Sequence, residues 1–382
     1  MRLLKISVKG LELFHGKAEV DFFAEKRVYA DNCEMVYRTF GNIFTNNVIS
    51  IVGINAAGKT SLLKLISFVL AILNGKSINS IGSRDILTES KEVRMEVLFY
   101  DKKYGVCKLY SIIKKALINE VEERYIFSEE SLWSKKISKI KSKKDFMNFE
   151  ESTLLKQRDN NAEFLQDDTS IAMSISKNNQ INIHDFIMDT NINLLRLLGN
   201  FPQELIAFLD PNIESITFDR DRNEAKIKFY GKESIPVSNP LAVLNYLSSG
   251  TVKGLNIFVS AMLVFEEGGY LIVDELENHF NREIVATLVR FFMNKDVNKS
   301  GATLVFSTHY SELLDEFERT DNIYIVRNRK GITIQKLCST LKRNDIKKSD
   351  AFKSDFLEGT VPTYDSYIAL KNIIIRGHIQ EA

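Results

Sequence analysis

The sequence predicts an α/β fold with a mixed or parallel central sheet, helices against that sheet, and an antiparallel β subdomain. Residues 48–52 form an apolar run that leads directly into a glycine-rich loop, and residues 60–73 then have helical character. Residues 270–273 and 302–307 are two further apolar runs. Strands that are apolar throughout are typical of a sheet buried on both faces, and helical segments between them favour parallel strands.

The antiparallel subdomain is predicted from alternating runs near the N-terminus and from residues 92–133. Leu3, Ile6 and Val8 share one such run. Period-two alternation is typical of strands that place one face on a core. Four parts are therefore expected: residues 1–134 and 211–337 as two halves of one domain, residues 135–210 as an insertion, and residues 338–382 as a C-terminal extension.

Residues 135–210 differ in composition from their surroundings and predict an inserted helical arm that is partly mobile. After the basic run KKISKIKSKKDF they are rich in Asn, Asp, Gln and Ser. Helical segments are expected around residues 183–198 and 202–209. The basic run suits a phosphate backbone, but we favour the alternative that it is a solvated face. Its lysines are Lys135, Lys136, Lys139, Lys141, Lys143 and Lys144.

Composition and charge argue against several classes of protein. A net charge of +1 over 382 residues gives no overall attraction to nucleic acid or membrane, so such binding would need a local patch. No apolar run reaches the ~20 residues of a bilayer span, and the N-terminus lacks a signal-peptide pattern. Cys33, Cys107 and Cys338 are widely spaced and predict reduced thiols in a cytoplasmic protein.

The loop GINAAGKT carries the strongest chemical signal in the chain. It fits GxxxxGK[ST] between a strand and a helix, where backbone amides and the helix N-terminus face nucleotide phosphates. Lys59 is expected to reach the β- and γ-phosphates, and the Thr60 hydroxyl to bind Mg²⁺. A chance glycine-rich turn is the alternative. The predicted nucleotide-binding residues are Gly53, Asn55, Ala56, Ala57, Gly58, Lys59, Thr60 and Ser61.

Two carboxylates and a histidine follow the next two apolar runs. Asp274 is placed to hold Mg²⁺ through water, and Glu275 to polarise an attacking water. A turn or a helix start is the alternative for this pair, and Glu277 is expected on the surface. His309, in the sequence STH, is predicted to contact the γ-phosphate and the catalytic water, with a structural histidine as the alternative.

Four motifs in this order, GINAAGKT, LSSGT, VDELENHFN and STH, resemble those of ABC-type ATPase heads of the RecF/SMC/OLD class. The likeness is greatest to bacterial AAA-family ATPases found alone or beside a nuclease or toxin in phage-defence and abortive-infection loci. It covers roughly residues 1–130 and 210–370. The resemblance implies an ABC-type ATPase head that holds ATP and Mg²⁺ between two copies of the chain.

The same resemblance assigns residues that act on the partner's nucleotide. The LSSGT turn would bind the γ-phosphate held by the opposite copy, and Asn281 would be the D-loop residue that crosses the dimer. The turn departs from the usual LSGGQ at its third and fifth positions. The implied signature residues are Ser248, Ser249, Gly250 and Thr251.

Two other family features have no clear counterpart in this sequence. No Gln occurs between Thr60 and Gln157, so a Q-loop residue is not assigned. Phe14 and His15 are both candidates for stacking on adenine. Too little chain follows Lys336 for a Toprim nuclease domain, so any effector is expected to be a separate protein.

The resemblance implies an ATPase that forms an ATP-dependent dimer or higher assembly and acts as sensor or regulator of a separately encoded nuclease or toxin in antiviral defence. A DNA-repair ATPase that binds duplex ends through the arm is the main alternative, so nucleic acid stays an open partner. The soluble subunit of a transporter is disfavoured by the missing glutamine and the long insertion. A scaffold that only holds nucleotide is disfavoured by the intact catalytic residues, and no membrane contact is expected.

Overall fold

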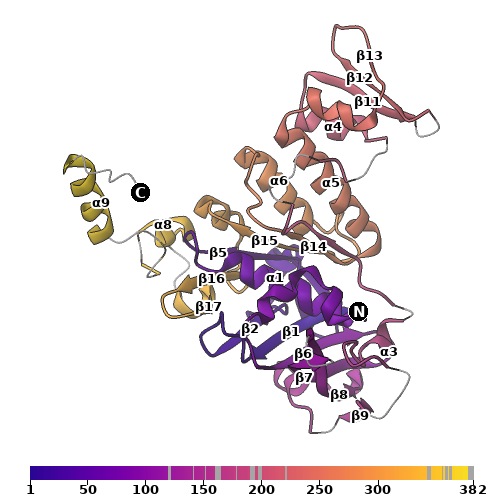
Figure 1. Ribbon diagram of the computed structural model, residues 1–382, viewed down its shortest axis with the longest axis vertical. Helices are drawn as coiled ribbons and strands as arrows, with labels where there is room; N and C mark the ends of the chain where they lie inside the picture. The colour runs from indigo at the N-terminus through magenta and orange to yellow at the C-terminus, as the bar shows by residue number, and fades with distance from the viewer. Residues whose placement is uncertain are drawn as a thin grey trace.

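The structure is a computed structural model in which two sheets and their helices form the body of the molecule (Figure 1). A smaller sheet stands at one end of this body, and the C-terminal helix lies to one side in Figure 1. The structure describes residues 1–118, 122–140, 142–150, 152–159, 165–177, 179–189, 194–196, 200–219, 222–341, 346–354, 356–357, 360 and 364–376.

A six-stranded sheet forms the centre, in the order β10-β14-β15-β5-β16-β17. All neighbours are parallel except β16 and β17, so the predicted mixed central sheet is confirmed. Every residue of β5, β14 and β15 is buried, as expected for strands covered on both faces. The strands are β5 (Val48–Val52), β10 (Ile183–Asp185), β14 (Tyr270–Val273), β15 (Thr303–Thr308), β16 (Ile323–Asn328) and β17 (Ile332–Lys336).

A second six-stranded sheet is antiparallel throughout, in the order β2-β1-β6-β7-β8-β9. Helix α1 (Lys59–Leu73) lies between the two sheets (Figure 1) and contacts strands of both. The predicted antiparallel subdomain is therefore confirmed. Its strands are β1 (Arg2–Lys9), β2 (Lys17–Asp21), β6 (Glu92–Asp101), β7 (Gly105–Ile118), β8 (Glu122–Lys135) and β9 (Thr153–Gln157).

Successive residues of the central strands enter two separate cores. Ile49 and Ile51 of β5 lie in the core shared with α1 and the antiparallel sheet, whereas Val48 and Val52 lie in the core on the opposite face. Burial of each such side chain is worth about 1.5–3 kcal/mol. Because a slip of one residue would exchange the two faces, this packing fixes the register and hence the position of the loop after Val52.

The opposite face of the central sheet is covered by α5 (Ser249–Glu267) and α6 (Arg282–Met293) (Figure 1). The remaining strands and helices are β3 (Val36–Phe40), β4 (Ile43–Asn46), β11 (Ile213–Asp219), β12 (Glu224–Phe229), β13 (Ile235–Val237), α2 (Lys143–Met147), α3 (Met173–Ser176), α4 (Gln203–Leu209), α7 (Leu337–Thr340), α8 (Lys348–Lys353) and α9 (Tyr364–Arg376). Strands β11 and β12 pair as an antiparallel hairpin ahead of the LSSGT turn.

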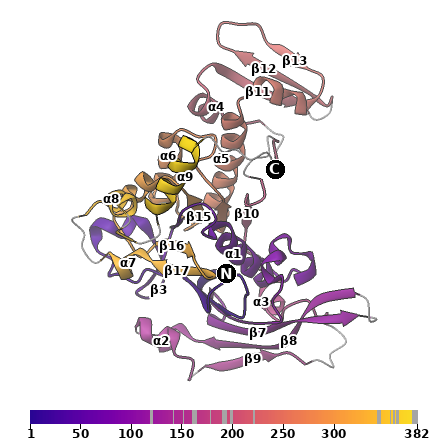
Figure 2. The same ribbon diagram turned by 60° about the vertical axis from the view of Figure 1, so that its left-hand side comes forward.

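The inserted helical arm expected over residues 135–210 is corrected by the structure. Strand β9 joins the edge of the antiparallel sheet, where Figure 2 shows it beside β8, and β10 joins the edge of the central sheet. The helix expected around residues 183–198 begins instead with this strand, whereas the helix over residues 202–209 is confirmed as α4. The division of the chain into four parts stays a prediction.

A buried carboxylate explains why this segment folds back on the sheet. Glu130 of β8 is 1% exposed and accepts hydrogen bonds from Arg158 Nε at 3.0 Å and Nη2 at 2.8 Å. Ser170 Oγ donates to it at 2.6 Å, and the amide of Ile171 at 2.9 Å. A buried charge is costly unless it is paired and hydrogen-bonded. Glu130 therefore holds the chain at Arg158 and at residues 170–171 against β8. Composition alone does not reveal these partners.

The basic run at the start of this segment is only partly a solvated face. Lys135 is 6% exposed, and its Nζ donates to the carbonyls of Asp145 at 2.9 Å and Asn148 at 3.1 Å. Lys143 Nζ donates to the carbonyl of Glu25 at 2.5 Å. Lys141 lies outside the described residues. At least two of the six lysines therefore bind protein carbonyls.

The cysteines and the helices bear on two further expectations from composition. Cys33, Cys107 and Cys338 are free thiols, as their spacing predicted. Burial raises the pKa of the Cys107 thiol to about 12, so this thiol stays protonated at neutral pH. In the part of the chain that the structure describes, no helix combines the length and apolar character needed to cross a membrane.

Candidate functional site

The predicted site residues meet at one edge of the central sheet. β15 lies between β5 and β14, and all three strands are parallel. Their carboxyl ends therefore lie at the same edge, which is where open α/β sheets bind ligands. Gly53 follows β5, Asp274 follows β14, and His309 follows β15.

Two glycines shape the loop between β5 and α1. Gly58 has φ 98°, and a Cβ there would lie 2.5 Å from Ile332 Cδ1 of β17. A Cβ on Gly53 would lie 2.5 Å from the carbonyl oxygen of Val326. The glycines therefore let the loop lie directly against β16 and β17. All eight predicted nucleotide-binding residues, Gly53, Asn55, Ala56, Ala57, Gly58, Lys59, Thr60 and Ser61, lie in this loop or in the first turn of α1.

Lys59 points its ammonium back over the loop. Its Nζ donates to the carbonyls of Gly53 at 3.0 Å and Ile54 at 3.1 Å and lies 3.4 Å from His309 Nδ1. Burial lowers the pKa of the Lys59 ammonium, and the nearby carboxylates oppose that shift. A side chain in this position can exchange weak carbonyl partners for the oxygens of an anionic ligand.

A set of hard oxygen atoms lies beside the lysine. Thr60 Oγ1 donates to Asp274 Oδ2 at 2.6 Å, and Ser307 Oγ donates to Asp274 Oδ1. One hydroxyl and one carboxylate fit Mg²⁺, which keeps several waters and takes further oxygens from bound phosphates. Within the described residues, no group of three or more His, Cys, Asp and Glu side chains could hold a metal. The arrangement therefore suits a cation that arrives with a nucleotide.

Glu275 and His309 face each other next to this oxygen set. His309 Nε2 lies 3.4 Å from Glu275 Oε1, and Asn278 Nδ2 donates to Glu275 Oε2 at 2.5 Å. Ser307 Oγ accepts from the amide of Glu275 at 2.7 Å. Glu275 has φ 45°, a left-handed conformation that is uncommon for a residue other than glycine. The carboxylate is partly exposed and can accept a hydrogen bond from a water at the site.

Glu277 corrects the sequence-based expectation of a surface side chain. It is 5% exposed, and its Oε1 accepts a hydrogen bond from the amide of His309. Its Oε2 is buried and has no hydrogen-bond partner among the described residues. Glu277 thus holds the backbone that carries the histidine. The signal available in the sequence was its place three residues after Asp274, on the same short loop.

The signature residues begin α5 and contact the loop after β14. Ser248 is the N-cap, and its Oγ accepts from the amide of Thr251 at 3.0 Å. Ser249 Oγ lies 3.1 Å from His279 Nδ1, and a Cβ on Gly250 would lie 2.4 Å from the carbonyl oxygen of His279. Ser248 and Ser249 are exposed. In this chain the hydrogen bonds of these described side chains end on α5 itself or on His279.

Asn281 has a structural role within the chain. It is the N-cap of α6, and its Oδ1 accepts from the amide of Ile284 at 3.1 Å. The loop of residues 274–281 therefore runs from Asp274 and Glu275 to the start of α6 and passes the LSSGT turn. A role for Asn281 across a dimer stays a prediction.

Lys253 is a site residue that the sequence analysis missed. It lies on the first turns of α5, is 9% exposed, and donates from Nζ to the carbonyl of Glu275 at 3.0 Å. Burial lowers the pKa of the Lys253 ammonium to about 8, while Glu277, Glu275 and Asp274 oppose the shift. Its sequence signal was weak, because a lysine two residues past the signature also suits a helix surface.

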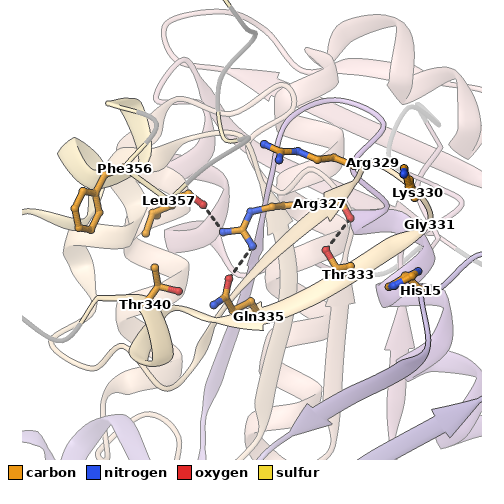
Figure 3. A pocket seen from close by; sticks show the side chains of 10 residues that line it. All are labelled: His15, Arg327, Arg329, Lys330, Gly331, Thr333, Gln335, Thr340, Phe356 and Leu357. Carbon is orange, nitrogen blue, oxygen red and sulfur yellow. Dashed lines mark hydrogen bonds between the residues drawn. The ribbon is translucent and has the colours of Figure 1, made fainter.

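A basic cavity of about 530 Å³ lies beside β16 and β17 (Figure 3). Arg329, Lys330 and His15 line one side of it, next to Ile332, and Asn328 Nδ2 donates to the carbonyl of Ala56 at 3.4 Å. On the other side Arg327 donates to Gln335 Oε1 at 2.7 Å and to the carbonyl of Leu357 (Figure 3).

Only one of the two candidates for adenine stacking lines this cavity. Phe14 is 5% exposed and belongs to the core beneath α1. His15 is exposed and lines the cavity. Phe14 is therefore not available as a stacking surface in this structure, and His15 stays a candidate.

The fold and the site together define a P-loop nucleotide-binding protein. Residues 48–315 match the family described as AAA domain, putative AbiEii toxin, Type IV TA system. This match covers more than half of the 382 residues, so the chain belongs to that family and is an AAA-type P-loop ATPase by family. Comparison with curated proteins gives no match. The likeness to the RecF/SMC/OLD class stays a prediction.

Proposed function

We propose that this chain binds ATP with Mg²⁺ and hydrolyses it as an ABC-type head that dimerises around the nucleotide. The observation that carries the proposal is the meeting of five side chains at the carboxyl ends of β5, β14 and β15. These are Lys59, Thr60, Asp274, Glu275 and His309. Membership of an AAA-type family supports the nucleotide as ATP.

Each side chain has a definite part in such a hydrolysis. Lys59 binds phosphate oxygens in place of the loop carbonyls, and Thr60 with Asp274 holds the cation directly or through water. Mg²⁺, when bound, neutralises charge on the phosphates. Glu275 accepts a hydrogen bond from the attacking water and takes its proton, and His309 orients the water and the γ-phosphate from the other side.

The dimer is inferred from the exposed side chains of the signature turn. Ser248 and Ser249 lie at the N-terminus of a 19-residue helix, where amides and the helix dipole favour an anion. Their side-chain contacts within the chain end on α5 and His279, so a nucleotide on a second copy is the ligand that suits this turn. Asn281 lies on the same loop as His279, and this position supports a part for it in the contact.

For the biological role, we propose that the assembly senses infection and regulates a separately encoded nuclease or toxin. The family description, which names a putative AbiEii toxin and a type IV toxin–antitoxin system, supports a role in a system of that kind. ATP binding would hold one state of the assembly, and hydrolysis or a trigger would shift it to another.

The test of the shared site uses Glu275→Gln with Lys59→Ala as its matched control. Glu275→Gln removes the base but keeps the shape, so we expect retained ATP binding, loss of turnover by at least about 100-fold, and an ATP-dependent dimer or larger assembly. Size-exclusion chromatography with light scattering measures that assembly. Lys59→Ala should bind no nucleotide and stay unassembled. Unchanged elution of Glu275→Gln with and without ATP contradicts the dimer.

A further inference from the structure

Helix α5 carries a lysine whose ammonium lies in the protein interior. Lys253 is 9% exposed and lies on α5 between the buried residues Val252 and Gly254. Burial of an ammonium costs free energy unless specific partners compensate. A lysine at this position is therefore expected to do more than fill space.

The partner of Lys253 is the backbone of the catalytic glutamate. Its Nζ donates to the carbonyl of Glu275 at 3.0 Å and lies 5.4 Å from the centre of the Phe280 ring. Glu275 has a positive φ, so its peptide orientation needs support from surrounding groups. The ammonium supplies that support from α5.

The charged groups that attract the Lys253 ammonium are carboxylates of the loop after β14. Glu277, Glu275 and Asp274 attract it from the loop after β14. Lys253 also lines a cavity of about 120 Å³, together with Asp189 and Arg196. Those two side chains are paired with each other. Lys253 therefore serves the loop that carries the catalytic carboxylates.

Helix α5 contacts the loop after β14 at two places. Lys253 holds Glu275, and Ser249 with Gly250 contacts His279 four residues further along. Both contacts come from the first turns of α5, which is a continuous helix from Ser249 to Glu267. A shift of the signature turn is thus transmitted to both ends of the segment 275–279.

We propose that Lys253 is a positioning residue that couples nucleotide contact at the signature turn of a protomer to the placement of that protomer's own Glu275. The inference rests on the proposed shared site, because the signature turn is expected to bind the partner's nucleotide. When the γ-phosphate draws the start of α5 toward it, the Lys253 ammonium carries the Glu275 peptide with it. Glu275 then reaches its catalytic position only in the closed dimer, so the two sites hydrolyse ATP together.

The experiment compares Lys253→Met, Lys253→Arg and Lys226→Met, an exposed lysine of β12 that serves as a control. Lys253→Met keeps length and removes the donor, so kcat is expected to fall about 10- to 100-fold, the loss typical of a misplaced catalytic group. KM and ATP affinity should change less than about twofold. Lys253→Arg should recover much of kcat, and Lys226→Met should match the unmodified protein.

Cooperativity gives a readout that a merely structural lysine would not change. The unmodified protein should show a Hill coefficient above one for ATP turnover, and Lys253→Met a value near one. Normal kcat in Lys253→Met, or a parallel loss of ATP affinity that arginine does not rescue, would overturn the inference.

Combining Lys253→Met with Glu275→Gln separates the inference from the proposed function. The double variant should still assemble with ATP, because Lys253 acts on catalysis and not on closure. If Glu275→Gln alone fails to assemble, the shared site is wrong and the coupling loses its basis. If both assemble and Lys253→Met hydrolyses ATP normally, only the coupling is wrong.

Discussion

At the scale of single residues, two buried lysines at the site offset the negative charge of three carboxylates. Lys59 and Lys253 face Asp274, Glu275 and Glu277 from opposite elements, α1 and α5. The carboxylates follow one strand, so their charges accumulate on one short loop. Each lysine offsets part of that repulsion, which lets the loop remain largely buried.

The lowered pKa of Lys253 predicts how stability depends on pH. The pKa is about 8 in the folded chain and 10.5 when exposed. Between these values the unfolded chain binds more protons, so the free energy of unfolding rises with pH. Relative to Lys253→Met, the unmodified protein should gain about 2 kcal/mol between pH 7.5 and 9.5. Urea unfolding of both proteins at the two pH values measures this gain, and a constant difference contradicts the assignment.

At the scale of elements, the phosphate loop depends on a strand far away in the sequence. β17 forms the surface against which Gly58 lies, through Ile332. The amide of His15 donates to the carbonyl of Ile332 at 2.9 Å, so the N-terminal segment is tied to the same strand. The geometry of the loop is therefore set by strand, helix and an edge hairpin together.

Replacement of Gly58 tests this dependence. Gly58→Ala meets both a positive φ and the side chain of Ile332, so we expect at least about 10-fold weaker ATP binding and a loss of stability of about 1–2 kcal/mol. Gly82→Ala is the control, because no atom lies within 4 Å of its added Cβ and its φ is not positive. Fluorescent-nucleotide titration and thermal unfolding measure both effects. Equal behaviour of the two variants would show that the loop tolerates a side chain.

At the scale of the whole molecule, residues 135–210, predicted as an inserted helical arm, contribute one strand to each of the two large sheets. β9 and β10 extend different sheets, and Arg158 fixes the chain between them to Glu130. Two lysines of the basic run bind carbonyls within the protein. These contacts weigh against a continuous basic surface for a duplex along this run.

Duplex DNA is therefore expected to leave ATP turnover unchanged. The measurement is steady-state hydrolysis with and without blunt duplexes at ionic strengths between 50 and 200 mM, a range over which phosphate contacts lose much of their strength. Stimulation at low salt that disappears at high salt would favour the DNA-repair alternative. Lys139→Glu would then show whether the exposed part of the basic run is responsible.

The order of segments along the chain is enough to predict the local chemistry of the site and the kind of sheet that carries it. A buried strand, a glycine loop and a helix follow one another in the chain, and so do the strands before Asp274 and His309. Short-range geometry and the parallel sheet then bring their ends together, because parallel strands share one carboxyl edge.

Contacts between distant parts of the chain, by contrast, set which charged residues are buried and where residues 135–210 lie. The roles of Glu277 and Lys253 depend on contacts with residues 32 and 22 positions away in the chain. Glu130 likewise finds its partners 28 and 40 positions further on. Composition and periodicity describe each segment alone, whereas the cost of burying a charge depends on the partner that folding brings beside it.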